Sequence, residues 1–90
     1  MVKNKCLAAL EDLTLKCGDK EAYFEGTTIN ARAEQMFGVS FFKYYNTKSM
    51  RIFHNQMKKY VSQGLVSRIN IIRYRDGFIQ KLIGYRYREE

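Results

Sequence analysis

The sequence predicts an α+β fold in which three helices are followed by a C-terminal β-hairpin. Apolar residues recur at three- and four-residue spacing in three separate segments, which is typical of helices with one buried face. A long segment rich in β-branched and aromatic residues follows, interrupted by Asp76-Gly77, a dipeptide that favours a two-residue hairpin turn. Because the chain has 90 residues, no proline and no linker-like segment, we expect one domain, residues 1–90.

The first helix is predicted over residues 2–17. Lys16 in its last turn and Gly18 directly after it are typical of a helix C-terminus. A short strand is expected next, within Ala22-Tyr23-Phe24. The apolar stripe of this helix comprises Val2, Cys6, Ala9, Leu10, Leu13 and Cys17.

The second helix is predicted over residues 28–37, with Thr27 or Thr28 as its N-terminal cap and Gly38 ending it. Residues 39–46 fit either a continued helix or an irregular turn. The side chains expected to be buried on the second helix are Ile29, Ala33, Met36 and Phe37.

The third helix is predicted over residues 47–63, capped by Asn46 or Thr47 and ended by Gly64. Its apolar positions again follow helical spacing, so they predict a buried face. These positions are Met50, Phe53, Met57, Tyr60 and Val61.

The hairpin is predicted over residues 65–88, with its turn at residues 76–77. A two-residue turn fixes the register of the two strands, because each residue before the turn then faces one residue after it. The expected pairs are Arg75 with Phe78, Tyr74 with Ile79, Arg73 with Gln80 and Ile71 with Leu82.

The positive charge of the chain is concentrated in its second half. Residues 1–42 contain five Lys or Arg and six Asp or Glu, whereas residues 43–90 contain eleven Lys or Arg and only three acids. A basic region confined to one part of a folded domain indicates a polyanionic partner. The plain alternative is a charged surface that serves only solubility.

The order of elements and the segment TKSMRIFHNQMKKYVSQGLV, residues 47–66, resemble the winged helix-turn-helix superfamily. Phe53, Met57 and Tyr60 stand where the third helix of that family has core positions, and Gly64-Leu65-Val66 is similar to its step into the first wing strand. The sequence departs from the family in one respect, because Gly38 follows Ala33 by five residues instead of four. The resemblance implies that the third helix enters the major groove of duplex DNA and that the hairpin forms a wing against the backbone or the minor groove.

This geometry assigns candidate DNA contacts by helical phase. Arg51 has the donors to read guanine, and Asn55 has the donor and acceptor to read adenine. The lysines are expected on phosphates, which position the protein without reading sequence. The full candidate set is Lys48, Ser49, Arg51, Ile52, Asn55, Gln56, Lys58, Lys59, Arg73, Arg75 and Lys81. Because these side chains are also ordinary surface residues, a solvated face remains the simpler interpretation of each.

The function expected from the sequence is sequence-specific binding of double-stranded DNA, as in a small transcriptional regulator. The alternative is a winged-helix module that binds protein, as a viral protein that binds a host factor would. The alternation of Tyr74, Tyr85 and Tyr87 with arginines also fits single-stranded nucleic acid. Whether the chain acts as a homodimer is left open by the sequence.

Other classes of function find little support. There is one histidine, no Ser/His/Asp or Cys/His grouping and no glycine-rich phosphate loop, so we expect neither an enzyme nor a cofactor. Cys6 and Cys17 would lie about 16 Å apart on one helix, too far for a disulfide, and with His54 alone they are too few for a zinc site. No apolar run is long enough for a membrane span, so an intracellular, cytoplasmic protein is expected.

Overall fold

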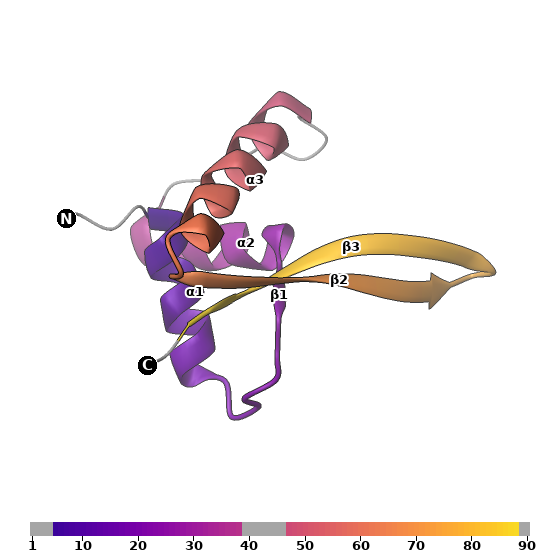
Figure 1. The fold of residues 1–90 in the computed structure, drawn as a ribbon, viewed down its shortest axis with the longest axis horizontal. Helices are drawn as coiled ribbons and strands as arrows, with labels where there is room; N and C mark the ends of the chain where they lie inside the picture. The colour runs from indigo at the N-terminus through magenta and orange to yellow at the C-terminus, as the bar shows by residue number, and fades with distance from the viewer. Residues whose placement is uncertain (1–4, 39–46, 89–90) are drawn as a thin grey trace.

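The structure, a computed structural model, describes residues 5–38 and 47–88, and within these it leaves out the side chains of Thr47 and Ser49. Its elements are α1 (Lys5–Lys16), β1 (Phe24–Glu25), α2 (Gly26–Phe37), α3 (Thr47–Ser62), β2 (Val66–Arg75) and β3 (Phe78–Tyr87). The strands form an antiparallel sheet in the order β1-β3-β2. The predicted α+β fold with three helices and a C-terminal hairpin is therefore confirmed. Figure 1 shows the helices gathered around one end of the hairpin, whose turn projects far from them.

The core lies between the three helices and the base of the hairpin. Four side chains of α1 are buried, Cys6, Leu7, Ala9 and Leu10, and Leu13 packs against them. Thr14 is also buried, and its hydroxyl accepts a hydrogen bond from the backbone N–H of Tyr87 at 3.1 Å, which ties α1 to β3. Leu7 and Thr14 were not in the predicted stripe, and Val2 lies outside the described residues.

Helix α2 begins two residues earlier than predicted, at Gly26, so the expected caps at Thr27 and Thr28 are wrong. The N-cap position is Glu25, in an extended conformation and without a side-chain cap hydrogen bond. Gly26 lies close to α3, since a Cβ atom there would lie only 3.0 Å from Cε1 of Phe53. The predicted stop is confirmed, since Gly38 has φ +70° and donates its N–H to the carbonyl of Glu34 at 2.8 Å.

The buried side of α2 covers fewer residues than the spacing of its apolar residues predicts. Ile29 and Ala33 are fully buried, whereas Met36 and Phe37 are 39% and 40% exposed, so their predicted burial is wrong. The last turn of α2 lies beyond the core cluster, which ends on this helix at Ala33. There Phe37 meets Lys5, whose Nζ lies 5.8 Å from the ring centroid.

Helix α3 is fixed by one buried face. Phe53 and Met57 are buried, Tyr60 and Val61 pack against the core, and Met50, which was predicted to join them, is 36% exposed because it lies before the first buried turn. The helix ends at Ser62, one residue before the predicted end. Gly64, at φ +77°, allows the chain to reverse, and Leu65 donates its N–H to the carbonyl of Tyr60 at 2.9 Å. The segment 39–46, including the alternative cap Asn46, lies outside the described residues.

The hairpin has the predicted register. Arg75 pairs with Phe78, Tyr74 with Ile79, Arg73 with Gln80 and Ile71 with Leu82. Both turn residues have positive φ, +50° at Asp76 and +79° at Gly77, as a two-residue turn of this kind requires. Strand β1 is Phe24–Glu25, at the end of the segment expected to hold it, and pairs with Tyr85 and Gly84 of β3.

Because side chains alternate along a strand, the hairpin has two faces. We call the face that carries the buried Val66 and Tyr85 the helix-side face, and the opposite one the outer face. The helix-side face consists of Val66, Arg68, Asn70, Ile72, Tyr74, Ile79, Lys81, Ile83, Tyr85 and Tyr87. The outer face consists of Ser67, Ile69, Ile71, Arg73, Arg75, Phe78, Gln80, Leu82, Gly84 and Arg86.

Candidate nucleic-acid interface

The free face of α3 carries a stripe of polar and basic side chains. Lys48, Arg51, Asn55 and Lys59 recur at intervals of three or four residues, and all four are exposed. Ile52 lies within the stripe and is 53% exposed. At 1.5 Å of rise per residue the stripe is about 16 Å long. It lies on the side of α3 opposite the buried Phe53 and Met57, so the same packing that anchors the helix presents this stripe to solvent.

The remaining candidates on α3 lie at the edges of this stripe. Lys58 is exposed and Gln56 is half-buried, whereas the side chain of Ser49 lies outside the described part of the structure. Helix α3 contains no acidic residue. Among the residues that the structure describes, no ion pair engages Lys48, Arg51, Lys58 or Lys59. The helix therefore presents four positive charges that no described carboxylate neutralises.

The buried side of α3 is joined to the sheet by an aromatic cluster. His54 Nδ1 lies 2.7 Å from the hydroxyl of Tyr85, and the rings of Phe53 and Tyr85 meet edge to face with centroids 6.0 Å apart. Burial lowers the pKa of His54 below its ordinary value of 6.5, and the nearby charges of Arg68 and Lys58 lower it further. The imidazole is therefore neutral near pH 7, and the ring tautomer decides whether Nδ1 accepts the hydrogen bond from the Tyr85 hydroxyl or donates to it.

The three hairpin candidates differ in their availability. Arg75 and Lys81 are exposed, on the outer and the helix-side face respectively. Arg73 also lies on the outer face, but it forms an ion pair with Glu25 of β1. Only Arg75 and Lys81 are thus without an ion pair to a described residue.

The tyrosine and arginine residues of the hairpin do not form one exposed stacking surface. Tyr85 is buried in the core, and Tyr87 is partly buried. Arg86 donates hydrogen bonds to the carbonyls of Asp19 at 3.2 Å and Ala22 at 3.0 Å, so it holds the segment before β1. Of the three tyrosines only Tyr74 is exposed, at 79%. The alternation in the sequence thus reflects a half-buried hairpin.

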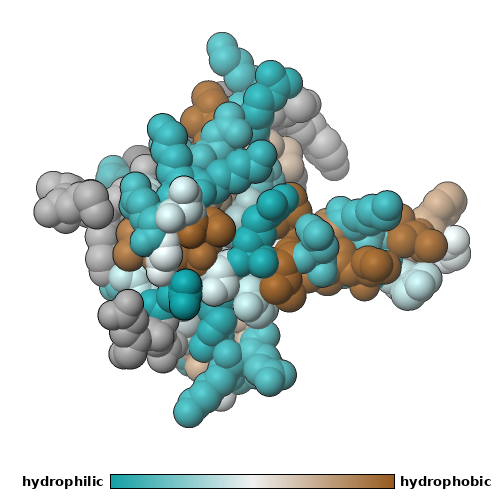
Figure 2. Space-filling view, viewed as in Figure 1, coloured by the Kyte–Doolittle hydropathy of each residue, from teal (hydrophilic) through white to brown (hydrophobic). Residues whose placement is uncertain are grey.

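A shallow groove separates α3 from the hairpin. Its volume is about 210 Å³. Met50 and His54 of α3 line one side, and Lys81, Leu82 and Ile83 of β3 line another. Figure 2 shows mostly hydrophilic side chains over α3, and hydrophilic and hydrophobic side chains next to one another along the projecting hairpin. The surface in this view is therefore more uniformly hydrophilic over the helix than along the hairpin.

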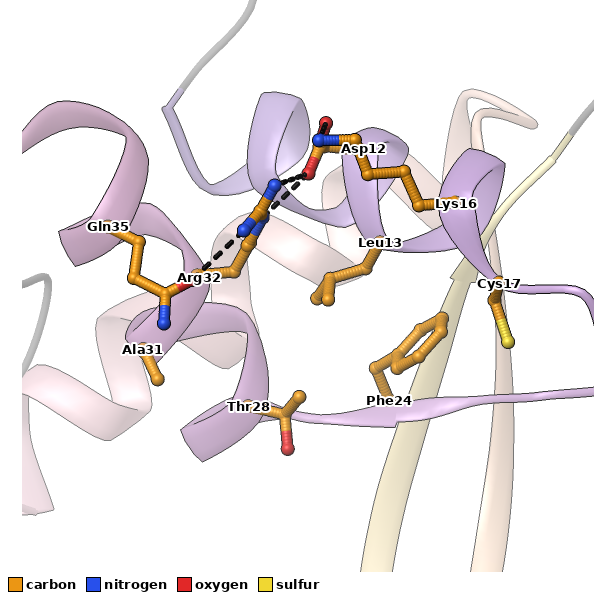
Figure 3. Close-up of a pocket in the computed structure, with 9 residues that line it drawn as sticks. All are labelled: Asp12, Leu13, Lys16, Cys17, Phe24, Thr28, Ala31, Arg32 and Gln35. Carbon is orange, nitrogen blue, oxygen red and sulfur yellow. Dashed lines mark hydrogen bonds and ion pairs between the residues drawn. The ribbon is translucent and has the colours of Figure 1, made fainter.

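A second cavity, of about 440 Å³, lies between α1, α2 and β1 and is lined by no residue of α3 or the hairpin. Figure 3 shows its polar groups paired with one another, since Arg32 donates to Asp12 at 2.6 Å and to Gln35 at 2.9 Å. Although burial opposes it, hydrogen bonds from Arg32 and Lys16 hold the pKa of Asp12 below its ordinary value. The charged groups of this cavity, Asp12, Lys16 and Arg32, are thus paired with one another.

The described residues contain no cluster with the composition of a metal site. No group of three or more His, Cys, Asp and Glu side chains comes together within residues 5–38 and 47–88. Neither cysteine forms a disulfide, and burial raises the pKa of Cys6 to about 12, so its thiol stays protonated. No helix in these segments has the length and apolar character needed to cross a membrane.

Comparison with protein-family models, with curated proteins and with solved structures finds no match to this chain.

Proposed function

We propose that the protein binds double-stranded DNA as a winged-helix domain, with α3 in the major groove and the hairpin as the wing. The observation that carries this proposal is the division of α3 into a buried apolar face and a free face that, with Lys58 at its edge, carries four cations that no described carboxylate neutralises. The element order and the sheet order β1-β3-β2 are compatible with that fold. A transcriptional regulator is the role that such a small sequence reader would have.

In the proposed complex the residues of α3 divide by task. Arg51 donates two hydrogen bonds to guanine, and Asn55 pairs with adenine, from the centre of the stripe. Lys48 and Lys59, near its two ends about 16 Å apart, reach phosphates on either side of a groove about 12 Å wide. Lys58, at the edge of the stripe, adds a further phosphate contact.

The hairpin contributes phosphate contacts beside the helix. Arg75 and Lys81 are exposed and lie on opposite faces of the hairpin, so at most one of them faces a given strand directly. Arg73 would have to exchange Glu25 for a phosphate. The wing therefore supplies less charge than the sequence alone predicts.

Selection of bound sequences from a random duplex pool tests the proposal, followed by affinity measurements with the enriched duplex. We expect the double variant Arg51→Ala/Asn55→Ala to lose about 10²-fold or more in affinity for that duplex, and to lose the preference for it over a scrambled one. The matched control is Lys20→Ala, which removes an exposed charge in the segment between α1 and β1 and should change neither property. If the wild type enriches no sequence and binds no duplex at low salt, the proposal is wrong.

One observation favours the second candidate, a winged-helix module that binds protein. Tyr74 and Phe78 are 79% and 74% exposed at the end of the hairpin, where a wing that met only phosphates would carry polar side chains. This candidate predicts no sequence preference in the selection and an undiminished nonspecific affinity in the Arg51→Ala/Asn55→Ala variant.

A further inference from the structure

The apolar pattern of the helix-side face continues beyond the helices that cover it. At the base of the hairpin Val66 and Tyr85 are buried under α1 and α3. Farther along the same face Ile72, Tyr74 and Ile79 are 61%, 79% and 60% exposed. Figure 1 shows this half of the hairpin projecting away from all three helices. The face thus has the composition of a buried surface where no described part of the same chain covers it.

Charge is distributed unevenly between the two faces of the projecting half. Arg73 and Arg75 both lie on the outer face. On the helix-side face, among Ile72, Tyr74, Ile79 and their cross-strand neighbours, the only charged side chain is Lys81, opposite Ile72. A face that contacted a phosphate backbone would carry the arginines. Because the arginines lie on the other face, the exposed part of the helix-side face is better suited to contact an apolar surface.

The projecting half of the hairpin, which we call the arm, would be stabilised by a partner that is present whenever the chain folds. A two-stranded hairpin is at best marginally stable alone in water, and strand β1 pairs with β3 only as far as Gly84. Both edges of the projecting half are therefore unpaired among the described residues, and each strand is ten residues long. A second copy of the chain is always available and carries an identical apolar patch. In a dimer with two-fold symmetry the two patches pack against each other.

The exposed area is sufficient for a small dimer interface. Tyr74 offers about 160 Å², taking about 200 Å² for a whole aromatic side chain. Ile72 and Ile79 together add about 150 Å². Two copies then bury about 600 Å² of apolar area, which corresponds to about 1,000 Å² in total if roughly 60% of the interface is apolar. With all three side chains completely covered, the contact thus comes to about 1,000 Å², the least that a specific interface needs, below the usual range of about 1,200–2,000 Å².

We propose that the protein forms a two-fold symmetric homodimer through the helix-side faces of its hairpin arms, centred on Ile72, Tyr74 and Ile79. This surface is separate from the free face of α3, and the dimer does not depend on DNA binding. The interface is small, so the dissociation constant should be in the micromolar range.

The experiment is sedimentation equilibrium of the full chain, without nucleic acid, from about 1 to 200 µM, a range chosen around the expected micromolar constant. We expect the wild type to pass from monomer to dimer within this range. Tyr74→Thr should weaken the dimer at least about tenfold, since a central aromatic side chain contributes much of the affinity of an interface. Thr is chosen because it retains strand propensity. The matched control is Phe78→Thr, which removes an equally exposed aromatic side chain on the outer face and should leave the dimer intact.

The possible outcomes distinguish a homodimer from other partners of this surface. A wild type that remains monomeric at the highest concentration overturns the proposal, whether the arm then binds DNA or another protein. Equal dissociation in Tyr74→Thr and Phe78→Thr overturns the assignment to the helix-side face and indicates nonspecific association of the tips. A dimer that survives Tyr74→Thr also overturns it. Circular dichroism confirms that each variant is folded, and a concentration-dependent midpoint of thermal unfolding, lost in Tyr74→Thr, gives an independent measure.

Discussion

The salt dependence of duplex binding can be worked out from the exposed cations. Each neutralised phosphate contributes about −0.9 to the slope of log K against log salt concentration. Four cations meet phosphates and make no ion pair with a described residue: Lys48, Lys58, Lys59 and Arg75. Lys81 is not counted, because it lies on the face of the hairpin opposite Arg75 and shares that face with the proposed dimer contact. The expected slope is therefore about −3.6, which corresponds to a loss of about 150-fold in affinity between 50 and 200 mM salt.

Single charge substitutions test where the slope originates. Lys59→Gln should make the slope less negative by about 0.9, because one phosphate contact is lost. Lys20→Gln removes the same charge from an exposed position between α1 and β1 and should leave the slope unchanged. Fluorescence anisotropy of a labelled duplex measures both. A wild-type slope shallower than about −2, or equal slopes in the two variants, would refute the assignment of phosphate contacts to this face.

Three further predictions concern the packing beneath this surface. Gly84→Ala places a Cβ atom 2.8 Å from Cβ of Tyr23, which is fixed to the backbone, and 2.8 Å from Cδ1 of Ile71. The substitution should cost about 1–3 kcal/mol in the free energy of unfolding, measured in urea, whereas unchanged stability would mean that the segment carrying Tyr23 shifts freely. Burial lowers the pKa of His54, so the unfolded state binds the proton more readily than the folded state, and the stability of the wild type should fall as pH drops below about 6.5. The variant His54→Gln should lack this part of the decline. A parallel decline in both proteins would contradict the prediction. Tyr85→Phe leaves His54 Nδ1 without its hydrogen-bond partner and should cost about 1 kcal/mol near pH 7. A cost indistinguishable from zero would show that water replaces the hydroxyl there.

The elements were predictable because their signals are local. Helical spacing located the buried side of α3, with Phe53 and Met57 at its centre, and Asp76-Gly77 determined the hairpin register pair by pair. The errors came from neighbours that spacing does not reveal. Met36 and Met50 have the right phase for burial, but the core ends before either of them. Phase states which side of a helix faces inward, whereas the length of the covered side depends on where the next element ends.

The candidate site was predictable on the helix and less so on the hairpin. On α3 the amphipathic phase alone separates Arg51 and Asn55 from the core, and both are exposed. On the hairpin the availability of Arg73 depends on Glu25, which lies 48 positions earlier in the chain. The contact between His54 and Tyr85 spans 31 positions. No local pattern reports such pairs, because they arise only when β3 is placed between β1 and β2.

The two proposals together constrain the DNA site. In a dimer with a two-fold axis through the arms, the two α3 helices are related by the same axis, so the free faces must present identical side chains to two half-sites in opposite orientation. Duplex selection would then enrich a palindrome, with half-sites separated by a whole number of helical turns. Tyr74→Thr should abolish the advantage of two half-sites over one while retaining affinity for a single half-site, because the free face of α3 is unchanged. If a protein that sediments as a dimer enriches a single, non-palindromic site, the arms hold the two α3 helices in positions from which they cannot both contact the same DNA.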